Sequence, residues 1–392
     1  MPKREERMQN KDIELLLSPE VRAAIEENIE RDPNEIALSK SVPAARVVAT
    51  QVKYLQRSRR KLPSYYDSRA ILTPLAFEQS SSEECAAHKR FEGELAVDLT
   101  CGLGVDSLYL SRRFGRVIAC ERNAELADIT RHNLKLLGAD NVEVLTTDAE
   151  SLLDTITHAD LIYADPDRRS NSGRKMVCLE ECSPNIADLL PLLKSKADHL
   201  AIKLSPMFDT TEALVRFGEG SDVEVISLAG EVKEVVVYWS RGKAESEITA
   251  TALGVGSFTL SAQKSHATPP SVPFDPTRYH YLVVPDASLR KAGLVAEWCK
   301  REGLDCYGHY GFATERPEAA MGRIYNIKVS HPYQPKHLKR LFPKGSGIQL
   351  IRHSFPLSSA AICKALGVKE GAGSKWAFAE IDKALWAIEL ED

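Results

Sequence analysis

The amino-acid sequence predicts an α/β protein whose central part is a doubly wound, mostly parallel sheet. Short apolar runs alternate with helical segments between residues 94 and 206, and repeated strand–helix units place helices on both faces of a parallel sheet. A glycine turn and a series of acids follow the predicted strand ends. Doubly wound sheets bind their ligands at that edge, so the same pattern predicts a ligand site there.

The strands and helices of this sheet follow one another in a regular order. Strands are expected at residues 94–99, 116–121, 142–148, 159–166 and 199–206, followed by two successive strands within 222–240. A helix is predicted over 105–113 and another near 185–195. Asn123 is a favourable N-cap for a further helix, which Gly138 ends. Because no helix separates the last two strands, we expect an antiparallel strand at the end of the strand order.

Four segments are expected along the chain. They are a helical domain over residues 1–90, the sheet domain over 91–241, a linker with strand fragments over 242–278, and a smaller basic α/β domain over 279–392. Ser18 followed by Pro19 predicts a helix start in the first segment. Ser81 with Glu84 fits a capping box that opens a short helix.

The last segment reads as a second mixed α/β unit. Strands are predicted at residues 281–285, 324–330 and 347–353, helices at 288–303, 335–342 and 358–367, and two strands at the C-terminal end. Residues 319–369 contain no Asp or Glu and nine Lys or Arg, although the whole chain has a net charge of −4. A basic block on an acidic chain suggests a polyanionic partner, nucleic acid first. A solvated surface is the alternative.

Composition excludes several classes of protein. Of 392 residues, 43% are hydrophobic and 27% are charged, as in ordinary globular domains. No apolar run approaches the ~18–20 residues that a membrane helix needs, and the charged N-terminus is unlike a secretory signal. Eight cysteines without a CxxC pair favour a reducing compartment. We therefore expect a cytoplasmic protein without a membrane partner and without a metal site.

The chemistry is expected at the first strand end, where the chain reads Asp98-x-x-Cys101-Gly102-x-Gly104. The two glycines allow a tight turn and a close approach to a ligand. Ser107 stands where a dinucleotide motif would place its third glycine, which argues against a nicotinamide cofactor. The four predicted strand-end acids are Asp98, Glu121, Asp148 and Asp165. Glu121 is placed to bind ribose hydroxyls and Asp148 an adenine amine; the alternative is that such acids cap the following helices.

The segments VDLTCGLGVD, ACERN, TTDAE and LIYADPDRR resemble, in order and spacing, the motifs of class I S-adenosylmethionine-dependent methyltransferases, which have a Rossmann-like sheet. The chain as a whole resembles a bacterial group of RNA methyltransferases with a THUMP-like domain after the catalytic domain. EQSSSE (78–83), KLSP (203–206), EVKE (231–234) and PDASLRKAG (285–293) carry this wider resemblance. It implies a methyltransferase domain over 91–241, a THUMP-like domain over 279–392, S-adenosyl-L-methionine as cofactor and RNA as partner.

The resemblance also implies roles for individual residues. Cofactor contacts are expected from Asp98, Cys101, Gly102, Gly104, Glu121, Arg122, Asp148, Ala149 and Asp165. The catalytic segment would comprise Asp165, Pro166, Arg168 and Arg169, with Asp165 orienting or deprotonating the acceptor. Amine-methylating relatives have Asp or Asn, Pro, Pro and an aromatic residue at this position. Because the aromatic residue is missing here, a base-amine target is not implied; the two arginines either bind a phosphate or stack on a base, or pair with neighbouring acids.

Substrate contacts are expected in two places. Lys203 and Pro206 lie at the end of the next strand, where Lys203 either contacts a phosphate or neutralises the local acids. The basic block is expected to contact RNA through Arg323, Lys336, Lys339, Arg340, Lys344 and Arg352. The sequence thus predicts an RNA methyltransferase. A methyltransferase acting on a protein or a small molecule, and a non-catalytic RNA-binding protein with the same fold, are the alternatives.

Overall fold

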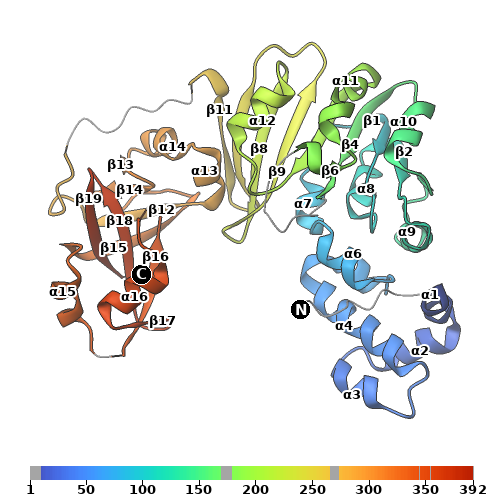
Figure 1. The fold of residues 1–392 in the computed structure, drawn as a ribbon, viewed down its shortest axis with the longest axis horizontal. Coiled ribbons are helices and arrows are strands. Elements are labelled where there is room, and N and C mark those ends of the chain that lie inside the picture. Colours follow the sequence, from blue (N-terminus) through green and yellow to red (C-terminus); the bar gives the residue numbers. More distant parts are fainter. Residues whose placement is uncertain (1–9, 169–178, 265–272, 344, 354, 392) are drawn as a thin grey trace. The chain divides into compact units, whose positions relative to one another are not determined.

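The computed structural model describes residues 10–168, 179–264, 273–343, 345–353 and 355–391 (Figure 1). The chain divides into two compact units. The first unit comprises Met1–Ser221 with Val236–Ala244, and the second comprises Asp222–Val235 with Glu245–Asp392. Within the described ranges, no helix has both the length and the apolar character needed to cross a bilayer.

From residue 10 onward, where the described part of the first unit begins, seven helices precede the sheet. They are α1 (Asn10–Leu17), α2 (Pro19–Glu27), α3 (Pro33–Leu38), α4 (Ala45–Lys61), α5 (Pro63–Asp67), α6 (Pro74–Gln79) and α7 (Glu83–Ala87). The predicted start of α2 is confirmed, because the Ser18 side chain accepts a hydrogen bond from the Val21 N–H and Pro19 is the first helical residue. The predicted capping box at Ser81 is wrong by one residue. Ser82 caps α7 instead, which leaves the Ser81 hydroxyl available for another contact.

These helices share a core with the helices of the sheet. Buried side chains of α2 and α4, such as Ile25 and Val52, belong to the same hydrophobic cluster as Leu134. The Asn133 side chain accepts from the Ile71 N–H at 2.9 Å and donates to the Ile71 carbonyl at 2.8 Å. Burial favours such fully paired polar groups. The N-terminal helices are therefore fastened to the sheet by packing and by specific hydrogen bonds.

The large sheet confirms the predicted doubly wound α/β fold. Its strands include β1 (Gly93–Asp98), β2 (Phe114–Cys120), β3 (Val142–Leu145), β4 (Ala159–Ala164), β7 (Ala197–Leu204), β8 (Ser221–Leu228) and β9 (Glu231–Ser240). The intervening helices are α8 (Val105–Leu110), α9 (Ala124–Leu136), α10 (Ala149–Thr155), α11 (Ile186–Lys196) and α12 (Thr210–Phe217). β1 pairs in parallel with β2 on one side and with β4 on the other. The order in which successive strands are added therefore reverses at β1, because β2 and β3 lie on one side of it and β4 on the other. β1 is thus the switch point of a doubly wound fold.

The position of β9 differs from the expectation. The hydrogen-bonded order of the large sheet is β11-β10-β8-β9-β7-β4-β1-β2-β3, so β9 lies between β7 and β8 and not at the end. Six consecutive residues of β9, from 234 to 239, are buried. A strand covered on both faces is typical of the interior of a sheet. Two strands of the segment expected to be a linker, β10 (Glu247–Ala252) and β11 (Gly256–Ser261), continue the order beyond β8.

The second unit contains an eight-stranded sheet with the order β13-β14-β12-β15-β19-β18-β16-β17 (Figure 1). The strands are β12 (Tyr281–Pro285), β13 (Asp305–Tyr307), β14 (Tyr310–Ala313), β15 (Gly322–Pro332), β16 (Gly347–Arg352), β17 (Lys369–Glu370), β18 (Ser374–Ile381) and β19 (Ala384–Glu391). Its helices are α13 (Ala287–Ala292), α14 (Val295–Arg301), α15 (Pro335–Leu338) and α16 (Ser359–Leu366), and a 3₁₀ turn at Lys339–Leu341 follows α15. The single helix predicted over 288–303 is two helices, because Gly293 at φ +72° ends α13 in a left-handed cap.

Candidate functional site

The strand ends of the first unit converge on one edge of the sheet. Asp98 at the end of β1 is level with Ala119 of β2 and with Tyr163 of β4, and Ala164 of β4 is level with Ile202 of β7. The residues that follow these strands therefore meet at the carboxyl edge. We call Asp98, the turn 101–104, Glu121, Asp165 and Lys203 the strand-end site.

The turn after β1 requires both of its glycines. Gly102 has φ +51° and Gly104 has φ +83°, values that L side chains rarely adopt. A Cβ atom on Gly104 would lie 2.8 Å from Cγ2 of Thr130, so the turn also packs tightly on α9. The Thr130 hydroxyl donates to the Gly102 carbonyl at 2.6 Å. Cys101 is buried in this turn, and burial raises the pKa of its thiol well above the usual value.

Asp98 holds the turn through two hydrogen bonds to its carboxylate. It is fully buried, and its carboxylate accepts from the Thr100 N–H at 3.0 Å and from the Ser107 hydroxyl at 2.6 Å. Burial raises the pKa of Asp98 to about 7, and these two hydrogen bonds oppose the shift. Ser107, which stands where a dinucleotide motif has its third glycine, therefore has a structural role here. It holds the carboxylate on which the shape of the turn depends.

Glu121 lies directly after β2 and is half-buried beside the glycine turn. Its Oε1 accepts from the Asn123 N–H at 2.8 Å. Burial raises the pKa of Glu121, while the N–H groups of Asn123 and Gly102 and the charge of Arg122 oppose that shift. The Arg122 guanidinium is exposed and donates to the Ser183 hydroxyl at 3.0 Å. The structure therefore places Glu121, but not the charged end of Arg122, against the turn.

Asp148 lies on the exposed end of the next connection. It is the N-cap of α10 and accepts from the Ser151 N–H at 2.7 Å, a contact that lowers the pKa of Asp148. Ala149, the first residue of that helix, is buried. The helix-capping alternative thus describes Asp148 in this structure. Its contact with an adenine amine stays a prediction.

Asp165 and Lys203 form the charged centre of the site. Nζ of Lys203 lies 2.6 Å from Oδ2 of Asp165, and their side chains are 12% and 33% exposed, respectively. The Asp165 N–H donates to the Thr100 hydroxyl at 2.7 Å, which connects this strand end to the glycine turn. Lys203 also donates to the Ser81 hydroxyl at 2.9 Å. The contact between Lys203 and Asp165 corresponds to one of the two roles expected for Lys203, the neutralisation of a local acid.

A buried pair lies behind Lys203 that the sequence does not reveal. The Ser81 hydroxyl donates to Oδ2 of Asp106 at 2.7 Å, and Nζ of Lys89 lies 3.6 Å from Oδ1 of Asp106. Lys89 is only 2% exposed. Burial alone would raise the pKa of Asp106, but Lys89 and Lys203 together hold it below its ordinary value.

The segment after Asp165 leads into a short ribbon. Pro166 is buried and Asp167 is exposed. β5 (Asp167–Arg168) pairs antiparallel with β6 (Cys182–Ser183). The side chain of Arg168 and the whole of Arg169 lie outside the described residues, so their catalytic roles stay predictions. Pro206, two residues after β7, is half-buried.

The basic block is less uniformly charged in three dimensions than in sequence. Lys328 lies 3.2 Å from Glu389 and 3.9 Å from Glu391, which belong to the neighbouring strand β19. Lys336, Lys339 and Arg340 are exposed on α15 and the 3₁₀ turn, and no carboxylate of the described chain forms an ion pair with them. We call these three residues the basic turn. Lys344 lies outside the described residues.

One group in the described residues has the composition of a cation site. His158, Asp160 and Asp198 each offer a ligand atom within 4.8 Å of the others. Asp198 pairs with His158 and with Arg241, and Oδ2 of Asp160 accepts from the N–H groups of residues 94 and 95. These contacts account for the group as a connection among β1, β4 and β7.

One known family matches the C-terminal part of this chain, and one solved structure matches nearly all of it. The THUMP domain-like family matches residues 322–391. A candidate methyltransferase of Porphyromonas gingivalis W83 has the same fold with a TM-score of 0.79 and 27% identity, and the match covers 98% of each chain. The chain therefore combines the class I methyltransferase fold with a C-terminal THUMP-like domain, as the sequence motifs predict.

Other solved structures match a smaller part of the chain. A precorrin 8w decarboxylase of Methanobacterium thermoautotrophicum is 21% identical over 44% of this chain and 97% of its own, with a TM-score of 0.32. An rRNA methylase of Streptococcus thermophilus is 15% identical over 40% of this chain and 92% of its own, with a TM-score of 0.29. No curated protein matches the sequence.

Proposed function

We propose that this protein transfers a methyl group from S-adenosyl-L-methionine to RNA. The observation that carries the proposal is the strand-end site, where the glycine turn, Glu121 and the Asp165–Lys203 pair lie on one edge of a methyltransferase-type sheet. The full-length similarity to the Porphyromonas gingivalis protein supports the same reaction class.

The residues of the strand-end site fit this cofactor. Gly102 is half-buried, and beyond its two chain neighbours the atom nearest to where its Cβ would stand is the Thr100 carbonyl oxygen, at 4.0 Å. The turn therefore allows a ligand to approach its backbone closely. The Glu121 carboxylate beside it is suited to accept hydrogen bonds from two ribose hydroxyls. The cofactor supplies an activated methyl group when bound, and the protein contributes chiefly alignment and electrostatics.

Asp165 is the residue placed to handle the acceptor. Its carboxylate is a third exposed, and Lys203 and the backbone contact to Thr100 hold it in position. A fixed carboxylate at this edge orients the acceptor group by accepting its hydrogen bond, and takes up its proton if that group must lose one. Lys203 donates to the Ser81 hydroxyl and is attracted by the charge of Asp106, which favours the position in which it pairs with Asp165.

RNA is the acceptor that the charge distribution favours. The basic turn exposes three cations without a described acidic partner, and such surfaces attract phosphate backbones. Lys328 is not counted in this surface because Glu389, 3.2 Å away, offsets part of its charge. The THUMP-like domain would then hold RNA while the sheet domain carries out the transfer.

The proposal is tested by transfer of a labelled methyl group to total RNA from a strain that lacks the protein, followed by nucleoside analysis. We expect wild type to label RNA and Asp165→Asn to lower kcat by about 100-fold or more, as loss of a positioned proton acceptor does. Asp154→Asn, which changes an exposed acid of α10, is the matched control and should retain activity.

Calorimetric titration with the cofactor separates binding from transfer. Glu121→Gln should weaken cofactor binding by about 10- to 100-fold, because hydrogen bonds to a charged group are worth about 1.5–3 kcal/mol. Asp165→Asn should bind the cofactor nearly as well as wild type. If the protein binds the cofactor but the label appears only in protein or in small molecules, then one of these is the substrate and RNA is not. Absence of cofactor binding would indicate a non-catalytic protein.

A further inference from the structure

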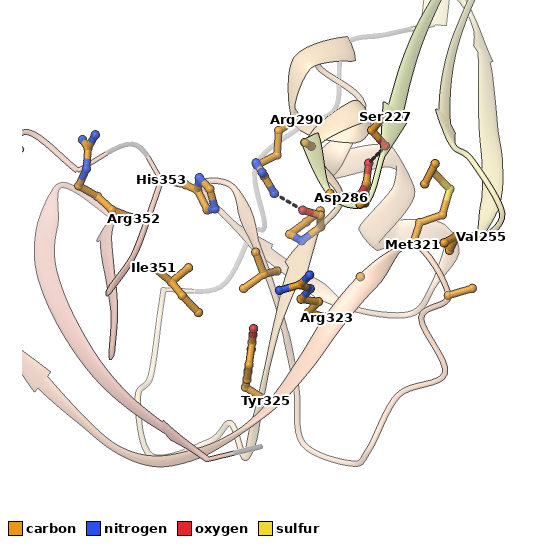
Figure 2. Close-up of a pocket in the computed structure, with 18 of the residues that line it drawn as sticks. Ser227, Val255, Asp286, Arg290, Met321, Arg323, Tyr325, Ile351, Arg352 and His353 are labelled. Atoms are coloured by element: carbon orange, nitrogen blue, oxygen red, sulfur yellow. Dashed lines mark hydrogen bonds between the residues drawn. The ribbon is translucent and has the colours of Figure 1, made fainter. Parts of the chain in front are cut away.

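A cavity of about 680 Å³ lies in the second unit, and no residue of the strand-end site lines it (Figure 2). It is bordered by the ends of β8 and β10, by the start of α13, and by β15 and β16. The Ser227 hydroxyl donates to the Asp286 carboxylate. The cavity therefore has a defined wall where residues far apart in the sequence meet.

Cations dominate the polar side of the cavity. The cations Arg290, Arg323 and Arg352 line it beside His353, whose pKa is lowered by burial and by the nearby arginines, and we call it the arginine cavity. Figure 2 shows the Arg290 and Arg323 side chains near the centre of the view, with Arg352 further out. Within the described chain, none of the three arginines forms an ion pair with a carboxylate.

Asp286, the one acid among the lining residues, is already engaged. Its Oδ1 accepts from the N–H of Ser288 at 2.8 Å and from the Ser288 hydroxyl at 2.7 Å, in addition to Ser227. It caps α13, and its charge only partly offsets the burial that lowers the pKa of Arg290. Arg290 in turn donates to the Pro285 carbonyl. The wall thus presents net positive charge to the cavity.

Apolar side chains complete the lining on both sides of Arg323, and we call Leu253, Val255 and Met321 the apolar wall. Val255 and Met321 lie together at one side in Figure 2, and Leu253 joins them in the lining. Tyr325 and Ile351 stand on the other side. A volume of 680 Å³ is within the range of small-ligand sites. A lone inorganic anion would leave the apolar wall in water, whereas a ligand with an anionic group and a flat ring would cover both surfaces.

We propose that the arginine cavity binds a phosphorylated nucleotide, with its phosphate at Arg290 and Arg323 and its base against the apolar wall. Guanidinium groups without an acidic partner are preferred ligands of phosphate. The nucleotide is either free or a unit of an RNA chain, and only the second choice rests on the proposed function. Nothing in the proposed methyl transfer requires this cavity.

The test is calorimetric titration of the full-length protein, without S-adenosylmethionine, with the four ribonucleoside monophosphates and their unphosphorylated nucleosides. At least one monophosphate should bind, and its nucleoside should bind far more weakly. Arg323→Gln should weaken binding by about 10-fold or more, the effect of losing a charge-assisted hydrogen bond. Arg316→Gln changes an exposed arginine of the same unit that does not line the cavity, and should leave binding unchanged.

Arg290→Gln serves as a second variant, because Arg290 is half-buried and contacts the backbone whereas Arg323 is exposed. A short single-stranded RNA as the second probe distinguishes the two sources. Binding of both probes with the same dependence on Arg323 indicates a nucleotide unit of RNA; binding of the monophosphate alone indicates a free nucleotide. No binding by any monophosphate or RNA, or wild-type affinity in Arg323→Gln, overturns the proposal. Since no methyl transfer is measured, a failure of the proposed function leaves this result unaffected.

Discussion

The strand-end site and the arginine cavity both gather charge, but they balance it differently. In the first, Lys203 lies against Asp165 and Lys89 against Asp106, with Ser81 connecting the two pairs. In the second, Arg290 and Arg323 have no ion-pair partner among the described carboxylates. One region uses opposite charges to hold each other in place, and the other keeps its cations available for an anion from outside.

This difference shows what each kind of charge can do. A network in which each group is paired positions its members and costs no reorganisation when a substrate arrives. Cations held near one another without acids raise the local potential, which attracts anions but does not stabilise the fold. The same residue types therefore serve positioning in one region and recruitment in the other, and variants should separate the two roles.

The largest expected effect comes from breaking the buried pair. Lys89→Met should lower the free energy of unfolding by about 3–5 kcal/mol, because it removes the buried ammonium that lies 3.6 Å from the Asp106 carboxylate. Denaturant titration measures this change. The double variant Lys89→Met with Asp106→Leu should recover most of the loss, since an apolar pair of similar volume is tolerated.

Arg116→Ala is the matched control for that pair. Arg116 lies 2.5 Å from Glu143, but the two side chains are 60% and 49% exposed, so the loss should be about 1 kcal/mol or less. Equal losses in Lys89→Met and Arg116→Ala would contradict a structural role for the buried pair.

The second expected effect is that the stability contributed by Asp98 of the strand-end site and by His353 of the arginine cavity changes with pH in opposite directions. Burial raises the pKa of Asp98 from an ordinary value of 3.8 to about 7. Between about pH 4 and 7 the folded protein keeps this proton while the unfolded chain releases it, so the contribution of Asp98 to stability falls as pH rises, by an amount on the order of 4 kcal/mol. The difference in stability between wild type and Asp98→Asn should follow this decline.

His353 should show the reverse dependence. Burial and the nearby Arg290, His309 and Arg352 lower its pKa from an ordinary 6.5 to about 4. Its stabilising contribution is therefore complete above pH 6.5 and is lost as pH falls towards 4. Denaturant titrations of wild type and His353→Gln across this interval check the sign. A parallel trend for His353→Gln and Asp98→Asn would refute the contrast between the two regions.

The smallest expected effect concerns the basic turn. Replacing Lys336, Lys339 and Arg340 together with Gln should flatten the salt dependence of RNA binding by about 2 in log–log slope, since each phosphate contact to a single strand contributes about 0.7. Fluorescence anisotropy at several salt concentrations measures the slope. Lys328→Gln should not change it, because Glu389 already pairs with Lys328. An unchanged slope in the triple variant would remove the basic turn from the RNA interface.

Local patterns were sufficient for most elements of the fold. Caps at Ser18 and Asn123 are confirmed, because an N-cap depends on one side chain and on N–H groups two or three residues away. The strands of the large sheet between residues 93 and 240 were recognisable from their apolar runs, whereas β10 and β11 were expected only as strand fragments in a linker. The placement of β9 was not, because strand order depends on which neighbour covers a strand and not on the strand's own residues.

The candidate site divides in the same way. Its glycine turn, Glu121 and Asp165 were predictable, because a parallel sheet brings the residues after its strands to one edge. Lys89, Ser81 and Asp106 were not, since a buried ion pair joins residues whose charges look like ordinary surface charges in sequence.

The sequence by itself determined the doubly wound sheet, the strand-end acids and the presence of a basic C-terminal segment, because alternation, capping and composition act over short distances along the chain. Only the tertiary structure decided which of these charges are neutralised. It brought Glu389 to Lys328, Lys203 to Asp165 and no described acid to Arg323. Pairing depends on distances between side chains that the fold sets, and electrostatic energy falls with that distance.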